Sequence, residues 1–284
     1  MSEQHAIKIV VGWNGTDEGK DALRLGAELA RLTSGPITVA CVIEPGALPP
    51  ELMRDRDAWV ERFRGLFSGA RHELGDLQFS VREAIEDAAE GLREIALEEG
   101  AELVVLGSTH RGLIGRVLPG TVAERLLADP PCAVAVAPRG YAGRPHAGLG
   151  LIGVGYDGSP EARAALTLAE RLAEAAGDEL RILSAAPEYV AGEIPLGPLE
   201  PLRQEAEQRV ERALEAVEPG VPASGSVMAG DPAATLEEQG VALDLLVIGS
   251  RGRGPVKSRL FGSVSADVIR RTPCPVLVVP GPDA

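Results

Sequence analysis

The stretch Pro131–Pro138, which reads PCAVAVAP, returns as PCPVLVVP at Pro273–Pro280, at an offset of 142 in the numbering. The same offset places Gly107-Ser108 on Gly249-Ser250 and Gly120-Thr121-Val122 on Gly262-Ser263-Val264. An offset of 143 places Gly12–Thr16 (GWNGT) on Gly155–Ser159 (GYDGS). Such regular spacing between glycine-rich blocks indicates that the chain is an internal duplication.

Length, charge and composition agree with two domains. The 284 residues carry 28 basic and 42 acidic side chains, a net charge of -14. The halves 1–142 and 143–284 carry 15 basic with 22 acidic and 13 basic with 20 acidic residues, so each has a charge of -7. The stretch Arg139–Gly150 is rich in Gly, Ala and Pro and is typical of a linker. We therefore expect one domain over residues 1–140 and a second over 149–284.

The composition also excludes several classes of protein. The negative charge repels phosphate backbones and anionic membranes, which argues against nucleic acid and membrane partners. No apolar run is long enough for a transmembrane helix, and the N-terminus MSEQHAIKIV lacks the regions of a secretion signal. Three cysteines make no disulfide framework, so a reducing cytoplasm is the expected location.

Short aliphatic runs alternate with amphipathic segments in both halves. We expect strands at 7–11, 37–43, 79–84, 103–106 and 133–137, and again at 151–155, 180–185, 223–228, 245–248 and 276–279. We expect helices at 17–32, 51–74, 92–99 and 121–128, and again at 161–176, 199–217, 233–239 and 263–271. Strands separated by helices imply right-handed crossovers, so each half is predicted to be an α/β domain with a doubly wound parallel sheet.

The last strand of each half is an aliphatic edge that needs a cover. The repeat suggests that these two strands pair with each other, so that the domains form a pseudo-dimer within one chain. A homodimer of the whole chain would then use other surfaces.

Ligands of such sheets bind beyond the carboxyl ends of the strands, where the strand order reverses. The loop after the fourth strand of the second half, GSRGRGPVKSRLFGS at 249–263, has four basic residues and no acidic one. Its glycines allow close backbone approach, and Gly262-Ser263 opens a helix whose free N–H groups can bind an anion. The loop is either a phosphate-binding loop or a solvated surface loop.

The spacing Gly249-x2-Gly252-x9-Gly262-Ser263 resembles the nucleotide-binding motif of the universal stress protein family. The GYDGS block, the Gly230-Asp231-Pro232 triplet and the closing PCPVLVV strand are also similar to that family. The resemblance covers both halves and therefore suggests a tandem-domain member. It implies the strand order 3-2-1-4-5, a cytoplasmic location and, as in many members, binding of ATP.

The resemblance also implies roles for individual residues. Asp157 would accept hydrogen bonds from the ribose or adenine, beside Gly155 and Tyr156. Ala185 would line the adenine pocket, with Ile248 packed nearby. The phosphates would be held by Gly249, Gly252, Gly262, Ser263 and Val264, and Arg251 and Arg253 would add positive charge. The implied ligand is ATP, or ADP or AMP, with Mg²⁺ accompanying ATP.

The first half departs from this motif. Asn14 replaces the aspartate, His110 replaces the second glycine, and Glu86-Asp87-Ala88 replaces Gly-x-Pro. His110 either blocks the backbone approach that glycine allows or itself donates to a phosphate. We expect weaker binding or none here. The corresponding positions are Asn14, Val42, Gly107, His110, Gly120, Thr121 and Val122.

The leading functional hypothesis is a stress-response protein that uses an adenine nucleotide as a regulatory or structural ligand, chiefly in the second domain. One alternative is a slow ATPase or another enzyme that transforms adenylates, although no general base is placed beside the phosphate loop. Another is an interaction module that binds no nucleotide. The four histidines show no metal-ligand spacing, so neither catalytic residues nor a metal site are assigned.

Overall fold

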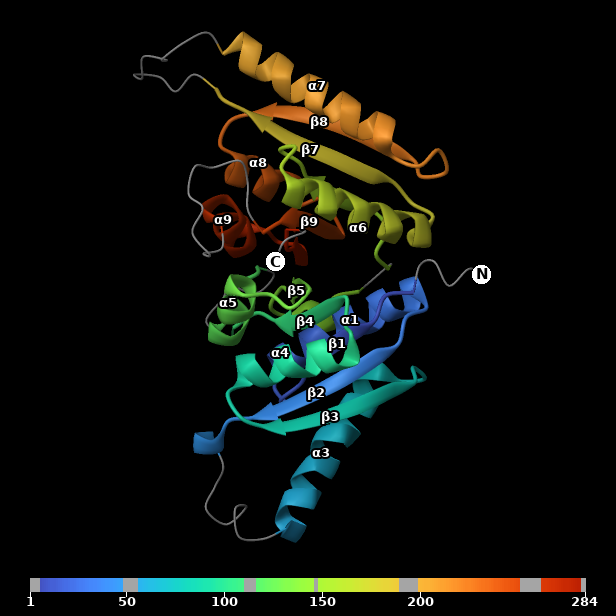
Figure 1. The fold of residues 1–284 in the computed structure, drawn as a ribbon. Coiled ribbons are helices and arrows are strands. Elements are labelled where there is room, and N and C mark those ends of the chain that lie inside the picture. The colour runs from blue at the N-terminus through green and yellow to red at the C-terminus, as the bar shows by residue number, and fades with distance from the viewer. Residues whose placement is uncertain are drawn as a thin grey trace. The chain divides into compact units, whose positions relative to one another are not determined.

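The chain folds into two compact α/β units, Met1–His146 and Ala147–Ala284 (Figure 1). The structure, a computed structural model, describes residues 6–47, 56–109, 116–145, 148–188, 199–250 and 262–281. Within these ranges no helix is long and apolar enough to cross a membrane.

The first unit is a five-stranded parallel sheet in the order β3-β2-β1-β4-β5. Its strands are β1 (Ile9–Gly12), β2 (Ile37–Ile43), β3 (Phe79–Ile85), β4 (Leu103–Gly107) and β5 (Ala133–Ala137). Its α-helices are α1 (Asp17–Thr33), α3 (Arg56–Leu74), α4 (Ala88–Glu99) and α5 (Thr121–Ala128), with 3-10 turns at Pro45–Ala47 and Tyr141–Gly143. The predicted fold class and strand order are confirmed.

The second unit repeats this arrangement with the order β8-β7-β6-β9-β10. Its strands are β6 (Ile152–Gly155), β7 (Leu180–Ala186), β8 (Ala223–Ala229), β9 (Leu245–Gly249) and β10 (Val276–Val279). Its helices are α6 (Pro160–Ala176), α7 (Glu200–Ala216), α8 (Pro232–Gln239) and α9 (Ser263–Arg271).

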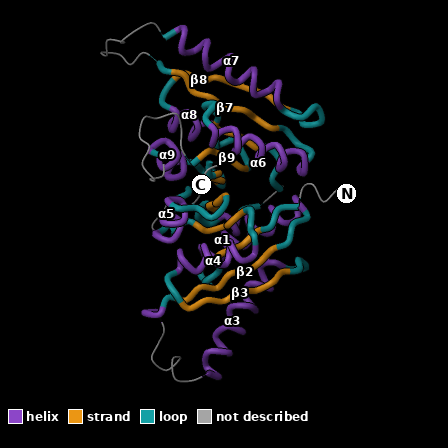
Figure 2. The backbone as a smooth tube through the Cα atoms, in the orientation of Figure 1, coloured by secondary structure: helices purple, strands orange, loops and turns teal. Residues whose placement is uncertain are grey.

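The central strands carry the core of each unit. The central strands β1, β4 and β9 are buried along nearly their whole length, whereas the edge strands β3 and β8 consist of half-buried and exposed residues. In the first unit α1 packs with α3, and α4 packs with α5, so the sheet lies between two pairs of helices (Figure 2). This layering accounts for the continuous aliphatic runs of the central strands, because strands buried on both faces need no polar alternation.

Helix α4 begins earlier than the predicted helix at 92–99. Asp87 caps it, because its Oδ1 accepts hydrogen bonds from the N–H groups of Ala89 at 3.0 Å and Glu90 at 3.3 Å. The N-terminal part of the helix predicted at 51–74 lies outside the described residues, and α3 is described from Arg56.

Part of the stretch that composition predicts as a linker is packed on the first unit. Asp21 of α1 is only 3% exposed, and its two carboxylate oxygens accept hydrogen bonds from the N–H groups of Gly140 at 2.7 Å and Ala142 at 2.8 Å. The chain that leaves β5 is therefore fastened to α1 by a buried carboxylate.

A second acidic residue of α1 strengthens this attachment. The hydroxyl of Tyr141, which is buried, donates to Glu28 Oε2 at 2.6 Å, while Arg24 Nε donates to Glu28 Oε1 at 2.7 Å. We call Asp21 and Glu28 the linker clamp. Ala164 and Arg171 occupy the corresponding positions of the second half, so the second unit lacks both carboxylates of the clamp.

The burial of Asp21 in the linker clamp predicts an unusual pH dependence of the free energy of unfolding. Burial raises the pKa of Asp21 above its ordinary value of 3.8, and this effect outweighs the opposing backbone hydrogen bonds from Ala142 and Gly140. The folded protein then holds this proton more tightly than the unfolded chain. The contribution of Asp21 to the free energy of unfolding should therefore be greatest at about pH 4 and below, and should fall as the pH rises through the raised pKa.

Urea unfolding of wild type and Asp21→Asn between pH 4 and 7 tests this. The stability of wild type relative to the variant should fall with rising pH. Asp76→Asn, at an exposed aspartate of the same unit, is the control. A relative stability that rises with pH, or is constant, would contradict the assignment.

Candidate functional site

A cavity of about 690 Å³ lies in the first unit at the carboxyl ends of its central strands. It is lined by the end of β1 and the loop after it, by the ends of β2 and β4, and by α4 and the start of α5. The predicted positions that it brings together are Asn14, Val42, Gly107, Gly120, Thr121 and Val122. His110, the remaining one, lies outside the described residues.

The loop after β1 forms one wall of this cavity. Asn14 Oδ1 accepts hydrogen bonds from the N–H group of Thr16 at 3.2 Å and from its hydroxyl at 2.8 Å. Thr16 in turn caps α1 by accepting from the N–H of Gly19. Trp13 also lines the cavity, and its indole N–H donates to the carbonyl of Leu66 at 2.8 Å. The loop is thus held from both sides.

The loop after β4 forms the opposite wall. The N–H of Thr109 donates to the carbonyl of Leu118 at 2.8 Å, and Ser108 and Pro119 form an antiparallel bridge. The buried hydroxyl of Ser108 donates to the carbonyl of Ala137 and accepts from the N–H of Leu118. The chain therefore leaves β4 and returns beside itself, which delivers it to the start of α5.

The N-terminus of helix α5 lies at the cavity, and no side chain caps it. Its N-cap is Gly120, which has no side chain to satisfy the first-turn N–H groups, and the next two residues, Thr121 and Val122, line the cavity. Free N–H groups at a helix N-terminus attract anions. This end of the cavity is therefore suited to a phosphate or another anionic group.

The second unit builds the same framework. Asp157 Oδ1 accepts from the N–H of Ser159 at 2.9 Å, as Asn14 does in the first unit. The N–H of Gly262 donates to the carbonyl of Ser250 at 3.0 Å, and Gly262 caps α9 without a side-chain hydrogen bond. The hydroxyl of Ser265 ties α9 to the end of β9 by donating to the carbonyl of Gly249 at 2.9 Å.

The predicted residues of the second unit lie on four elements. Gly155, Tyr156 and Asp157 lie at the end of β6 and just after it, Ala185 near the end of β7, Ile248 and Gly249 at the end of β9, and Gly262, Ser263 and Val264 at the start of α9. Arg251, Gly252 and Arg253 lie outside the described residues.

Sequence reasoning did not find several residues that line the first cavity. Leu118 and Pro119 reach it because the loop after β4 folds back on itself, and Leu92 because α4 packs over the sheet. No local pattern reveals these tertiary contacts. For Thr16, which also lines the cavity, the Asn14-x-Thr16 spacing is a local signal, since a side chain that accepts from the residue two positions later is a common turn.

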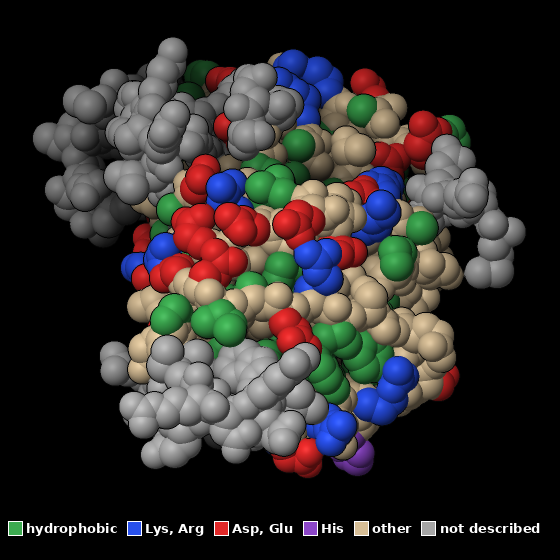
Figure 3. Space-filling view, turned by 60° about the horizontal axis from the view of Figure 1, so that its bottom comes forward, with side chains coloured by type: hydrophobic (Ala, Val, Ile, Leu, Met, Phe, Trp, Pro, Cys, Tyr) green, Lys and Arg blue, Asp and Glu red, His purple; other side chains and the backbone are tan. Residues whose placement is uncertain are grey.

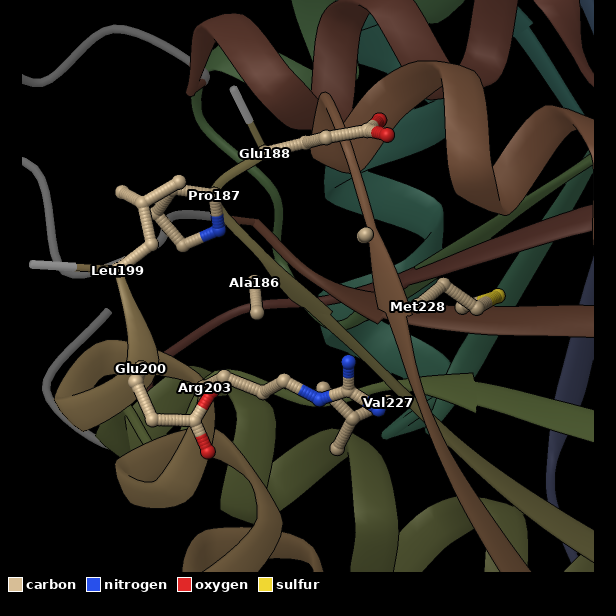
Figure 4. A pocket seen from close by; sticks show the side chains of 9 residues that line it. Ala186, Pro187, Glu188, Leu199, Glu200, Arg203, Val227 and Met228 are labelled. Atoms are coloured by element: carbon tan, nitrogen blue, oxygen red, sulfur yellow. The ribbon is translucent and has the colours of Figure 1, made fainter. Parts of the chain in front are cut away.

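A smaller cavity of about 320 Å³ lies in the second unit between α7 and the carboxyl ends of β7 and β8 (Figure 4). Ala186, Pro187, Leu199 and Val227 give it apolar walls, and Arg203 extends across it from α7. It contains none of the predicted site residues.

Acidic groups gather on part of the surface, as Figure 3 shows for one face. Burial and the neighbouring carboxylates of Glu94, Glu90 and Asp87 raise the pKa of Glu86.

Among the described residues no group of three or more His, Cys, Asp or Glu side chains could hold a metal ion. Burial raises the pKa of the Cys132 thiol to about 12, so this cysteine is not a nucleophile at neutral pH.

The model of the universal stress protein family matches residues 7–138 and again 150–280. The chain belongs to the universal stress protein family. A universal stress protein from Mycobacterium tuberculosis is 30% identical over 288 residues, which cover 97% of each chain. One from Thermus aquaticus is 36% identical over 136 residues, or 44% of this chain and 93% of that protein.

Solved structures of universal stress proteins share the two-unit fold. One from Archaeoglobus fulgidus covers 98% of this chain and 99% of its own, with a TM-score of 0.72 and 19% identity. A putative universal stress protein from Pseudomonas aeruginosa covers 99% and 96%, with a TM-score of 0.67 and 19% identity. The tandem arrangement of universal stress protein domains that the sequence suggested is confirmed.

The close packing at the end of β4 predicts that a substitution there strongly destabilises the first universal stress protein domain. A Cβ at Gly107 would lie 1.9 Å from the carbonyl oxygen of Glu18, so Gly107→Ala forces α1 away from β4. We expect a loss of about 1–3 kcal/mol or more in the free energy of unfolding, measured by urea denaturation.

Gly143→Ala is the control in the same unit, because a Cβ there would meet nothing within 4 Å. Equal stability losses in the two variants would show that the approach of α1 to β4 is not the tight contact described.

Proposed function

We propose that this universal stress protein binds an adenine nucleotide, with ATP the favoured form, as a regulatory or structural ligand at the carboxyl ends of its two sheets. The observation that carries the proposal is the cavity of the first unit, where motif positions far apart in the chain surround one space of about 690 Å³. Ligand pockets typically have volumes of about 300–1,000 Å³, so a nucleotide fits.

The lining suits the parts of a nucleotide. Val42, Ala40 and Leu92 offer apolar surface for a base, and Asn14 offers an amide beside them. At the other end the uncapped start of α5 and the Thr121 hydroxyl offer donors to a phosphate. These groups would bind and orient the nucleotide, and Mg²⁺ would arrive with the phosphates of ATP.

We propose that the second unit is the tighter site. Its motif keeps Asp157, Gly252 and the basic residues of the loop at 251–259, whereas the first unit has Asn14 and His110. Asn14 nevertheless makes the turn that Asp157 makes. This similarity supports weaker binding in the first unit rather than none.

The two tryptophans allow the first unit to be observed separately. Trp13 lines the cavity, so in a Trp59→Phe background its emission reports on ligand in the first unit. Calorimetry of the same protein gives the total number of sites. Mass spectrometry of ligand released from purified protein separates a nucleotide-binding protein from an interaction module, and steady-state phosphate release separates it from an ATPase.

A matched pair of substitutions tests the two sites. Thr121→Val should weaken ATP binding to the first unit, and Ser263→Ala to the second, because each removes one hydrogen bond to a charged phosphate, worth about 1.5–3 kcal/mol. Trp13 emission should respond to the first change only. Thr167→Val, which removes an exposed hydroxyl from α6, is the control. Absence of ATP binding at millimolar concentration would refute the proposal.

A further inference from the structure

An ion pair joins the two helices that line the cavity of the first unit. Arg125 of α5 approaches Asp87, the N-cap of α4, with 2.5 Å between Nη1 and Oδ2, and its Nη2 lies 3.8 Å from Glu90 Oε1. Ala88 and Leu92 of α4 line the cavity, as does the start of α5 from Thr121. The pair therefore bridges two walls of one cavity.

Asp87 serves both helices at once. Its Oδ1 accepts from the first-turn N–H groups of α4, and its Oδ2 holds Arg125. The hydrogen bond from Arg125 and those from the backbone lower the pKa of Asp87, so the pair is charged at neutral pH. Movement of α5 away from α4 would have to break this ion pair.

The second unit cannot form this contact. Its corresponding helix is capped by Asp231, but the position that matches Arg125 in the repeat is Asp267. Two carboxylates do not form an ion pair.

The connection between strand and helix also differs between the units. In the second unit Gly230 has a φ of +131° and Pro232 begins α8, a connection that glycine permits and proline fixes. The first unit has Glu86 and Ala88 at these positions and therefore has neither the glycine nor the proline. The ion pair supplies a different restraint at the same place.

We propose that Arg125 and Asp87 are positioning residues that hold α4 and α5 together across the cavity and thereby set how long the first unit retains its nucleotide. The proposal rests on nucleotide binding by the first unit. It predicts that the two units release the same ligand under different control, and that only the first responds to ionic strength through this pair. Both side chains are about half exposed, so salt screens their attraction.

The experiment measures release of a fluorescent ATP analogue from the first unit. Energy transfer from Trp13 is followed during a chase with unlabelled ATP, in a background of Trp59→Phe and Ser263→Ala. Arg125→Gln and Asp87→Asn, which keeps a good N-cap residue, should each accelerate release about two- to fivefold at low salt, the range of exposed ion pairs. The association rate should change little.

Further variants separate positioning from general loss of structure. Arg125→Lys should restore most of the slow release, and the double variant should be no faster than either single one. Raising the salt concentration should accelerate release from wild type but not from the variants. Arg64→Gln is the control, because Arg64 pairs with Glu61 within α3 and shares no partner with Arg125 among the described ion pairs.

The outcomes are distinguishable. If wild type binds the analogue in the first unit and both variants release it at the wild-type rate, or if Arg64→Gln accelerates release equally, the positioning role is overturned and nucleotide binding stands. If Trp13 shows no binding at millimolar analogue, nucleotide binding by the first unit fails, and the positioning role fails with it.

Discussion

The candidate site depends on how closely the end of β4 approaches the first turn of α1. Parallel strands β1 and β4 lie side by side, and the helices that follow them belong to different pairs, so their loops diverge and leave space between them. The space has a defined wall only because Gly107 allows β4 to touch the backbone of Glu18. A side chain there would displace the helix whose first residues line the cavity.

The two units keep this constraint and differ around it. Gly249 in the second unit is likewise packed against Glu161 and Ala162 at the start of α6. Side chains around the site have diverged more freely: Asn14 replaces the aspartate of the motif yet makes the same turn. The duplication has therefore kept the close approach of a strand end to the first turn of a helix, while the side chains around it vary between copies.

The strands are predictable because their signals are local. The last strand of each half is predicted to the residue, since prolines bound its aliphatic run, and the strand order follows from the family resemblance. The start of α4 is not predictable in the same way, because it depends on a single capping carboxylate at Asp87. Contacts between distant segments, such as the return of Leu118 to Thr109, carry no sequence period at all. Sequence thus locates the motif positions but not the restraints that bring them together.

The linker clamp has a mechanical consequence. Tension applied to the chain beyond residue 144 reaches the first unit through Asp21 and Glu28 before it reaches β5. The load is then borne by α1, and α1 is the helix whose first turn lines the cavity. A pull on the tether would thus be transmitted to the cavity along a single rigid element, while the hydrogen bonds of the sheet remain unloaded until the clamp has opened.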